Sequence, residues 1–176
     1  MERCFSFADQ VKANDNGYFP YTPPTQLLHG LRASLDLLFS EGLANVFARH
    51  HRLAEGVRQG VAALGLDLCA AAPRWHSDTV SAIRVPEGVD GAEFCRIAYQ
   101  RYRTSFGGEL GQVAGKVFRI GHLGDLNEVS CLTALACAEM ALADAGAVVT
   151  LGSGVAAAQA RYRADPAPVP TPAAVA

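Results

Sequence analysis

The chain has 176 residues, of which 50% are hydrophobic and 18% are charged. This length favours one domain, and the composition is typical of a folded chain and excludes disorder along its whole length. The 15 basic and 17 acidic side chains give a net charge of -2, whereas a dedicated nucleic-acid-binding domain is usually basic. No apolar run reaches the roughly 20 residues of a membrane-spanning helix. We therefore expect neither a nucleic acid nor a membrane as a partner.

The first 24 residues form a polar lead-in, which one glycine and three prolines are expected to keep non-helical. In the next segment, residues 25–65, leucines and valines recur at helical spacing and predict two long helices. Thr25 is the expected N-cap of the first helix and Gly42 its end, and Gly65 ends the second helix.

Residues 66–163 alternate between strand and helix patterns, which predicts a small α/β domain. Segments rich in β-branched or apolar residues are the strand candidates, and Asp90 and Asn127 are positioned to cap two helices. The strands are expected at 79–85, 104–108 and 117–120, after a short apolar run at 66–71, and the helices end near residues 102 and 145, the second being the last helix.

The tail, residues 164–176, holds four prolines and no large side chain, and we interpret it as disordered. The pattern as a whole predicts an α/β fold, an α+β sandwich with a small sheet, preceded by long helices. Those helices need more apolar cover than the α/β unit supplies. A missing domain or a second subunit is therefore expected to pack against them.

The five cysteines are odd in number, and no two of them have CxxC spacing. This arrangement argues against a disulfide framework and against a zinc site. Cys131 and Cys137 lie in an Ala/Leu-rich stretch and are expected to be small buried side chains. The N-terminus lacks the basic segment and apolar core of a signal peptide. Together with reduced cysteines, this favours the cytoplasm.

Three motifs suggest functional sites, but structural explanations fit them better. Residues 152–157 match the GxGxxA dinucleotide fingerprint, yet the second strand and acidic residue that the fingerprint needs do not follow. His50 and His51, flanked by arginines, are expected to form a solvated basic face, because adjacent helical residues point in different directions. The glycine-rich residues 107–111 lack the GK[ST] ending of a phosphate loop. A flexible connection between two strands is the favoured interpretation, and a loop beside a binding site is the functional alternative.

Arg119 lies between Phe118 and Ile120 in an expected strand. Because strand side chains alternate, Arg119 faces away from both neighbours, toward another surface or a cleft if they face the core. A partly buried arginine suits a planar anion, since its fork gives two parallel hydrogen bonds to a carboxylate. A structural ion pair with an acidic side chain explains the same pattern, so the residues alone leave both roles open.

Three segments in the order GYFPYTPPTQLLHGLRASLDLLFSEGL, HHRLAEGVR and GKVFRIGHLGDLNE resemble the C-terminal part of class V aminotransferases. The resemblance is greatest to serine–glyoxylate aminotransferases, with alanine–glyoxylate aminotransferases as relatives, and runs from about residue 17 to residue 164. It implies the small C-terminal domain of a fold-type I pyridoxal-phosphate enzyme, with most of the large domain missing. It also implies a homodimer, or association with a chain that carries the large domain.

The resemblance implies transamination, in which serine or alanine gives its amino group to the cofactor pyridoxal 5'-phosphate and glyoxylate collects it. By this resemblance Arg119 binds the substrate carboxylate, and Thr22 and Tyr21 bind the cofactor, whose phosphate the YTP segment reaches in the neighbouring subunit. The family's Schiff-base lysine lies upstream of that segment, and neither Lys12 nor Lys116 matches its motif. No catalytic residue is therefore assigned, and the chain alone is expected to be inactive.

Two functions of different classes stay open. The chain is either an enzyme segment whose catalysis needs a lysine outside it, or a non-catalytic partner that associates with an intact aminotransferase or binds a small carboxylate. An in-frame, lysine-bearing continuation upstream of the Met1 codon supports the first. A promoter and ribosome-binding site directly upstream favour the second.

Overall fold

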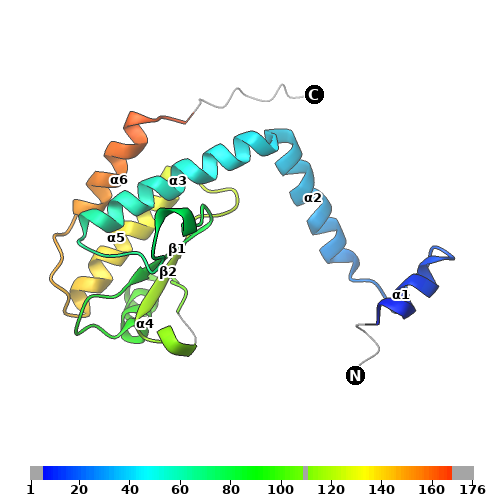
Figure 1. Ribbon diagram of the computed structural model, residues 1–176, viewed down its shortest axis with the longest axis horizontal. Coiled ribbons are helices and arrows are strands. Elements are labelled where there is room, and N and C mark those ends of the chain that lie inside the picture. Colours follow the sequence, from blue (N-terminus) through cyan, green and yellow to red (C-terminus); the bar gives the residue numbers. More distant parts are fainter. Residues whose placement is uncertain (1–5, 109–110, 168–176) are drawn as a thin grey trace. The chain divides into compact units, whose positions relative to one another are not determined.

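The computed structural model describes residues 6–108 and 111–167, and its contacts divide the chain into two units after Leu43 (Figure 1). The two long helices expected at 25–65 fall in different units, the first helix in unit 1 and the second in unit 2. The second helix belongs with the C-terminal residues because its side chains are part of their hydrophobic core.

Unit 1 begins with a helix that the sequence did not predict, α1 (Phe7–Asn14). The hydroxyl of Ser6 starts this helix by accepting a hydrogen bond from the backbone N–H of Asp9. Residues 18–24, which include the three prolines, are non-helical as predicted. The expectation of an entirely non-helical lead-in is therefore wrong for the part that precedes the glycine and the prolines.

Helix α2 (Thr25–Glu41) has the predicted bounds. Pro24 rather than Thr25 occupies the N-cap position, and Gly42 ends the helix with a φ of 85°. No side chain of α2 is buried. All but one of its large apolar side chains are exposed, namely Leu27, Leu28, Leu31, Leu35, Leu37 and Phe39. The exception, Leu38, is partly buried.

Unit 2 is built on an antiparallel two-stranded sheet of β1 (Val80–Arg84) and β2 (Val117–Gly121), with Ala82 opposite Arg119. The connection between the strands contains helix α4 (Gly91–Tyr102), which Asp90 caps as predicted. The remaining expected strand, 104–108, contributes only an isolated bridge from Gly107 to Arg119, and the apolar run 66–71 contributes one from Leu68 to Ile83. The prediction of a strand at 104–108 is therefore wrong, and two of its five residues are glycines, which favour strands poorly.

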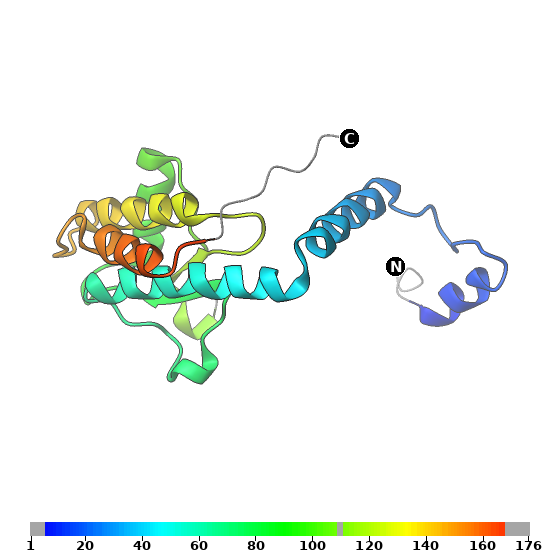
Figure 2. The same cartoon turned by 90° about the horizontal axis from the view of Figure 1, so that it is seen from above.

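Three helices of unit 2 lie side by side (Figure 2): α3 (Leu43–Ala63), α5 (Glu128–Asp144) and α6 (Ser153–Ala164). The α/β class predicted from the sequence is confirmed. The prediction that the helix ending near 145 is the last one is wrong, because α6 follows it. The expected disordered tail, 164–176, lies outside the described residues from 168 onward.

The core of unit 2 contains a cluster of three phenylalanine rings from α4, β2 and the segment between them. Phe94 lies 4.3 Å from Phe118 and 5.3 Å from Phe106 between ring centroids. Cys131 and Cys137 on α5 are buried as predicted, and their burial raises the pKa of both thiols. Across the described ranges, no helix has the length and apolar character that crossing a membrane requires.

Candidate functional site

Arg119 has the orientation that strand alternation predicts. Its neighbours Phe118 and Ile120 are 1% and 2% exposed in the core, whereas Arg119 is exposed on the opposite face of β2. The side chain lies on the sheet surface beside the segment that contains Gly107 and Gly108. The guanidinium group of Arg119 therefore lies at the surface, while its buried strand neighbours fix the backbone of β2 in the core.

The guanidinium of Arg119 is held against two glycines. Its Nη2 donates a hydrogen bond of 2.9 Å to the carbonyl oxygen of Gly108. The backbones of Gly107 and Arg119 exchange two further hydrogen bonds of 2.9 and 3.2 Å. A β-carbon on Gly107 would lie only 3.0 Å from Nε of Arg119. The glycine backbone is therefore a close-fitting support for this side chain.

The loop that follows β2 is fixed by the first half of α3. His50 Nδ1 donates to the carbonyl oxygen of Val46 at 2.7 Å, and its Nε2 accepts a hydrogen bond of 3.1 Å from the backbone N–H of Gly124. Arg49 donates to the carbonyl oxygens of Gly124 and Leu126. The expected solvated basic face is therefore wrong for His50, which is only 8% exposed because this loop covers it.

A buried histidine links the end of β2 to β1. His122, directly after β2, is 0% exposed, and its Nε2 lies 2.9 Å from the hydroxyl of Ser81 on β1. Its Nδ1 lies 3.1 Å from the carbonyl oxygen of Asp78. Burial lowers the pKa of His122, so we assign a neutral ring that donates from Nδ1 and accepts the Ser81 proton at Nε2. This ring joins the two strands at the end that carries the 122–126 loop.

The carboxylate of Asp78 lies between two basic side chains of α3. Arg58 Nη2 and His51 Nδ1 each lie 3.1 Å from one of its oxygens. Burial acts to raise the pKa of Asp78, but the hydrogen bonds from Arg58 and His51 outweigh it and lower the pKa overall. This ion cluster secures the turn before β1 to α3, and its position on a helix–turn contact indicates a structural role.

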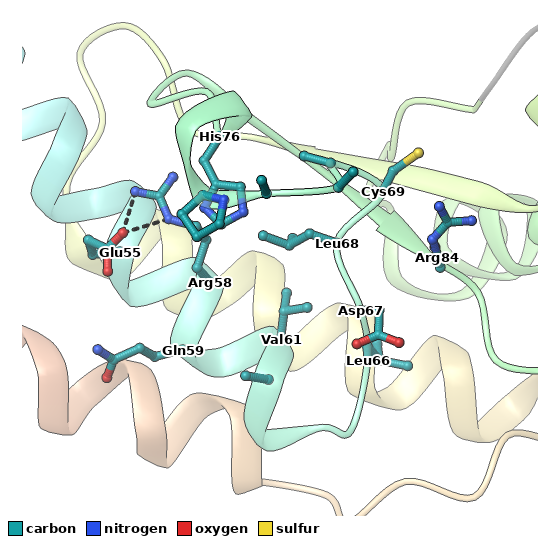
Figure 3. Close-up of a pocket in the computed structure, with 15 residues that line it drawn as sticks. Glu55, Arg58, Gln59, Val61, Leu66, Asp67, Leu68, Cys69, His76 and Arg84 are labelled. Carbon is teal, nitrogen blue, oxygen red and sulfur yellow. Dashed lines mark hydrogen bonds and ion pairs between the residues drawn. The ribbon is translucent and has the colours of Figure 1, made fainter.

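A separate pocket of about 700 Å³ lies between α3 and the segment that follows it (Figure 3). Its lining includes the acidic residues Glu55 and Asp67, the basic residues Arg58, His76 and Arg84, and Cys69. Figure 3 shows Arg58 paired with Glu55, and Arg119 does not line the pocket. The pocket is therefore distinct from the sheet surface that carries the predicted carboxylate-binding side chain. In the part of the chain that the structure describes, no cluster of His, Cys, Asp or Glu is placed to hold a metal ion.

Tyr21 and Thr22 lie in unit 1, in the non-helical stretch before α2, and both are exposed. Arg119 lies in unit 2, so the two predicted parts of the site belong to units that are described separately. Lys12 lies exposed on α1, and Lys116 lies exposed directly before β2. Neither lysine lines the pocket of Figure 3.

No protein-family model matches the chain. It is 65% identical over 159 residues to serine–glyoxylate aminotransferase of Hyphomicrobium methylovorum, a match that covers 90% of this chain and 39% of that protein. It is 54% identical to serine–glyoxylate aminotransferase of Arabidopsis thaliana, covering 88% of this chain and 39% of that one.

The solved structure of pyridoxamine–pyruvate aminotransferase from Mesorhizobium loti matches 91% of this chain and 41% of its own, with a TM-score of 0.83 and 36% sequence identity. The chain corresponds to the C-terminal region of a class V aminotransferase. The structure of ureidoglycine–glyoxylate aminotransferase from Bacillus subtilis agrees, with a TM-score of 0.82 over 89% of this chain and 26% identity. The aminotransferase chain spans about two-fifths of the length of the curated relatives it matches.

Sequence reasoning missed the parts of this aminotransferase region that support Arg119. The sequence favours a flexible connection for Gly107 and Gly108, with a loop beside a binding site as the alternative, and it assigns no role to His122. The available signal for Gly107 was a glycine within an expected strand, which often marks a close approach of another group. The contact of His122 with Ser81 joins residues 41 positions apart and leaves no local pattern in the sequence.

Proposed function

We propose that this chain acts as the C-terminal part of a pyridoxal-phosphate-dependent aminotransferase that transfers an amino group from serine or alanine to glyoxylate. The observation that carries the proposal is the 65% identity over 159 residues with a serine–glyoxylate aminotransferase. The chain covers 39% of that protein. The complete activity therefore depends on a lysine-bearing large domain that these residues do not include.

The residues of this chain suit the phosphate group of the cofactor but not its covalent attachment. Tyr21 and Thr22 are exposed residues before α2 whose side chains carry hydroxyl groups, and hydroxyl donors suit phosphate oxygens. Lys12 and Lys116 are exposed, and neither lines the pocket of Figure 3, whereas covalent activation needs a lysine held in a site that tunes its amine. This chain thus fits the phosphate and does not provide the covalent anchor.

Arg119 is the residue of this chain that we assign to the substrate. Its planar guanidinium forms two parallel hydrogen bonds with a carboxylate, and serine, alanine and glyoxylate each carry one. When bound, pyridoxal phosphate supplies an electron sink for the charge that develops at the substrate α-carbon. By fixing the carboxylate, Arg119 orients that α-carbon and reduces the number of unproductive binding modes.

The exposed apolar side chains of α2 indicate how the chain is completed. A row of leucines on a helix with no buried residue needs cover from another apolar surface. We propose a homodimer or association with a large-domain chain as the source of that cover. In this arrangement Thr22 and Tyr21 contact the cofactor of the neighbouring subunit, and the enzyme works in the cytoplasm.

The direct test is a chimera in which residues 17–164 of this chain replace the matching region of the Hyphomicrobium methylovorum enzyme. We expect the chimera to transfer the amino group of serine to glyoxylate at a rate comparable with its parent. A folded, cofactor-loaded chimera with no transamination would refute the proposal. The same experiment with alanine as donor shows which amino acid this C-terminal region prefers.

The absence of a fitting lysine on this chain favours one alternative, a non-catalytic domain that binds a small carboxylate through Arg119 or associates with an intact aminotransferase. Borohydride reduction of the 176-residue chain with pyridoxal phosphate, followed by peptide mass mapping, tests the lysine assignment. Both functions predict no stoichiometric adduct, and a single complete adduct on Lys12 or Lys116 contradicts the assignment. The chimera then separates the two functions, because only the enzyme segment restores turnover.

A further inference from the structure

We propose that Gly107 is a positioning residue for Arg119. The absence of a side chain at residue 107 lets the guanidinium lie flat against the backbone, where the Gly108 carbonyl oxygen fixes one of its nitrogen atoms. The proposal rests on the proposed function, since it concerns the arginine that we assign to the substrate carboxylate. It adds a second residue, distant in sequence, on which carboxylate recognition depends.

Backbone pairing and close side-chain packing bring Gly107 and Arg119 together. The backbones of Gly107 and Arg119 form an isolated antiparallel bridge through hydrogen bonds of 2.9 and 3.2 Å. Arg119 Nη2 reaches past Gly107 to the carbonyl oxygen of Gly108 at 2.9 Å. A β-carbon on Gly107 would lie 3.0 Å from Nε, 3.2 Å from Nη2 and 3.3 Å from Cβ of Arg119. The guanidinium and its stem therefore occupy the space beside this glycine.

Backbone conformation does not explain the glycine at this position. Gly107 is not among the glycines with positive φ in the described residues, so alanine is compatible with its backbone. Gly108 also lacks a positive φ, but a β-carbon there would meet nothing within 4 Å. The requirement at residue 107 is therefore space for Arg119, and the neighbouring glycine provides a matched control.

Such support matters because arginine has many rotamers, and holding one of them has an entropic cost. A bidentate pair needs the guanidinium plane aligned with the carboxylate plane. A side chain that is held in one orientation before the substrate arrives avoids most of the ordering cost during binding. A displacement of a few tenths of an ångström tilts the fork away from that orientation.

The first test uses the 176-residue chain and follows the Nε–H resonance of Arg119 by NMR, with the peak identified by its loss in Arg119→Lys. We expect Gly107→Ala to shift this resonance and to accelerate its exchange with water, whereas Gly108→Ala leaves both unchanged. An unchanged resonance in Gly107→Ala, or equal changes in both variants, overturns the proposal. This readout is independent of any enzymatic activity.

The second test places Gly107→Ala in the aminotransferase chimera, with Glu93→Ala as the control because Glu93 lies on the exposed surface of α4. We expect Gly107→Ala to raise KM for serine about tenfold with a smaller change in kcat, since it weakens carboxylate binding without touching the reacting bond. Its rate with ethanolamine, which has no carboxylate, should equal that of the chimera, and Glu93→Ala should equal it with both amines. Equal losses with serine and ethanolamine overturn the positioning role. If the folded chimera without these substitutions is inactive, the proposed function is refuted. The NMR experiment then decides by itself whether Gly107 positions Arg119.

Discussion

The ring of Tyr162 on α6 lies against the backbone of Gly56 on α3, so that a β-carbon on Gly56 would come within 2.1 Å of the ring. The hydroxyl of Tyr162 donates a hydrogen bond of 2.9 Å to the carbonyl oxygen of Leu53, one turn earlier on α3. The guanidinium of Arg52 lies 5.6 Å from the ring centroid, within the range of a cation–π contact. The contact between Tyr162 and Gly56 therefore holds α6 against α3 in the core of unit 2.

Substitution of Gly56 by alanine is expected to destabilise the chain by roughly 2 kcal/mol or more, because the ring must move and lose its hydrogen bond. Urea unfolding followed by circular dichroism measures the change. Gly30→Ala is the matched control, because Gly30 lies inside α2 and a β-carbon there meets nothing within 4 Å. Alanine at that position should be neutral or slightly stabilising through its higher helix propensity. A neutral Gly56→Ala would show that Tyr162 is not fixed in this position.

The buried His122 predicts a pH dependence of stability. Burial lowers the pKa of His122 below the ordinary histidine value of about 6.5, so at mildly acidic pH the unfolded chain binds a proton at this residue that the native chain does not. The free energy of unfolding should therefore fall as the pH is lowered through about 6.5, and should be independent of this residue above about 7.5.

Urea titrations between pH 7.5 and 5 test this prediction on the native chain and on His122→Gln. The substitution changes overall stability, but the informative quantity is the slope against pH, which should become smaller. Ser81→Ala provides a control that removes the hydrogen bond to Nε2 and keeps the titrating ring. An identical slope in the native chain and in His122→Gln would contradict the assignment of a neutral buried ring.

A carboxylate of α5 caps the N-terminus of α6. Glu139 is 3% exposed, and its two oxygens accept hydrogen bonds from the backbone N–H groups of Gly152 and Val155. Glu139→Ala should cost roughly 2 kcal/mol of unfolding free energy, because it leaves two N–H groups at the N-terminus of α6 without their acceptor. Glu139→Gln should lose less, since it keeps an acceptor and loses the charge that the helix terminus favours.

Glu93 supplies the surface comparison for this prediction, because it is half-exposed on α4 and pairs with Arg96 one turn away. Glu93→Ala should leave the unfolding midpoint nearly unchanged, as exposed ion pairs contribute little. Chemical unfolding of the three glutamate variants under one set of conditions gives the comparison. Equal effects of Glu139→Ala and Glu93→Ala would show that the buried cap does not stabilise α6.

The elements that sequence predicted correctly are those whose signals are local. Asp90 and Asn127 cap α4 and α5 through their own side chains, and Gly42 ends α2 through its own φ of 85°. Helix α6 has no side-chain cap of its own and takes its cap from Glu139 on α5. A cap that comes from another element leaves no pattern beside the helix, so periodicity and capping rules did not reveal α6.

The candidate site divides in the same way. The outward orientation of Arg119 follows from strand alternation and was predictable. Its contact with Gly107 depends on a bridge between two segments, and the burial of His50 depends on Gly124, which is 74 residues away. Such contacts arise only when the chain folds, so residue type and spacing did not indicate them.

The most direct test of the assigned function is a kinetic comparison of the aminotransferase chimera with its Arg119→Ala and Arg119→Lys variants. A hydrogen bond to a charged group contributes about 1.5–3 kcal/mol, so Arg119→Ala should lower kcat/KM for serine by roughly 10-fold to 100-fold or more. Arg119→Lys should recover only part of the loss, because an ammonium group does not form the bidentate pair. The absorbance of the bound cofactor should be the same in all three proteins. An unchanged kcat/KM in folded Arg119→Ala would contradict the carboxylate-binding role and return Arg119 to a structural one.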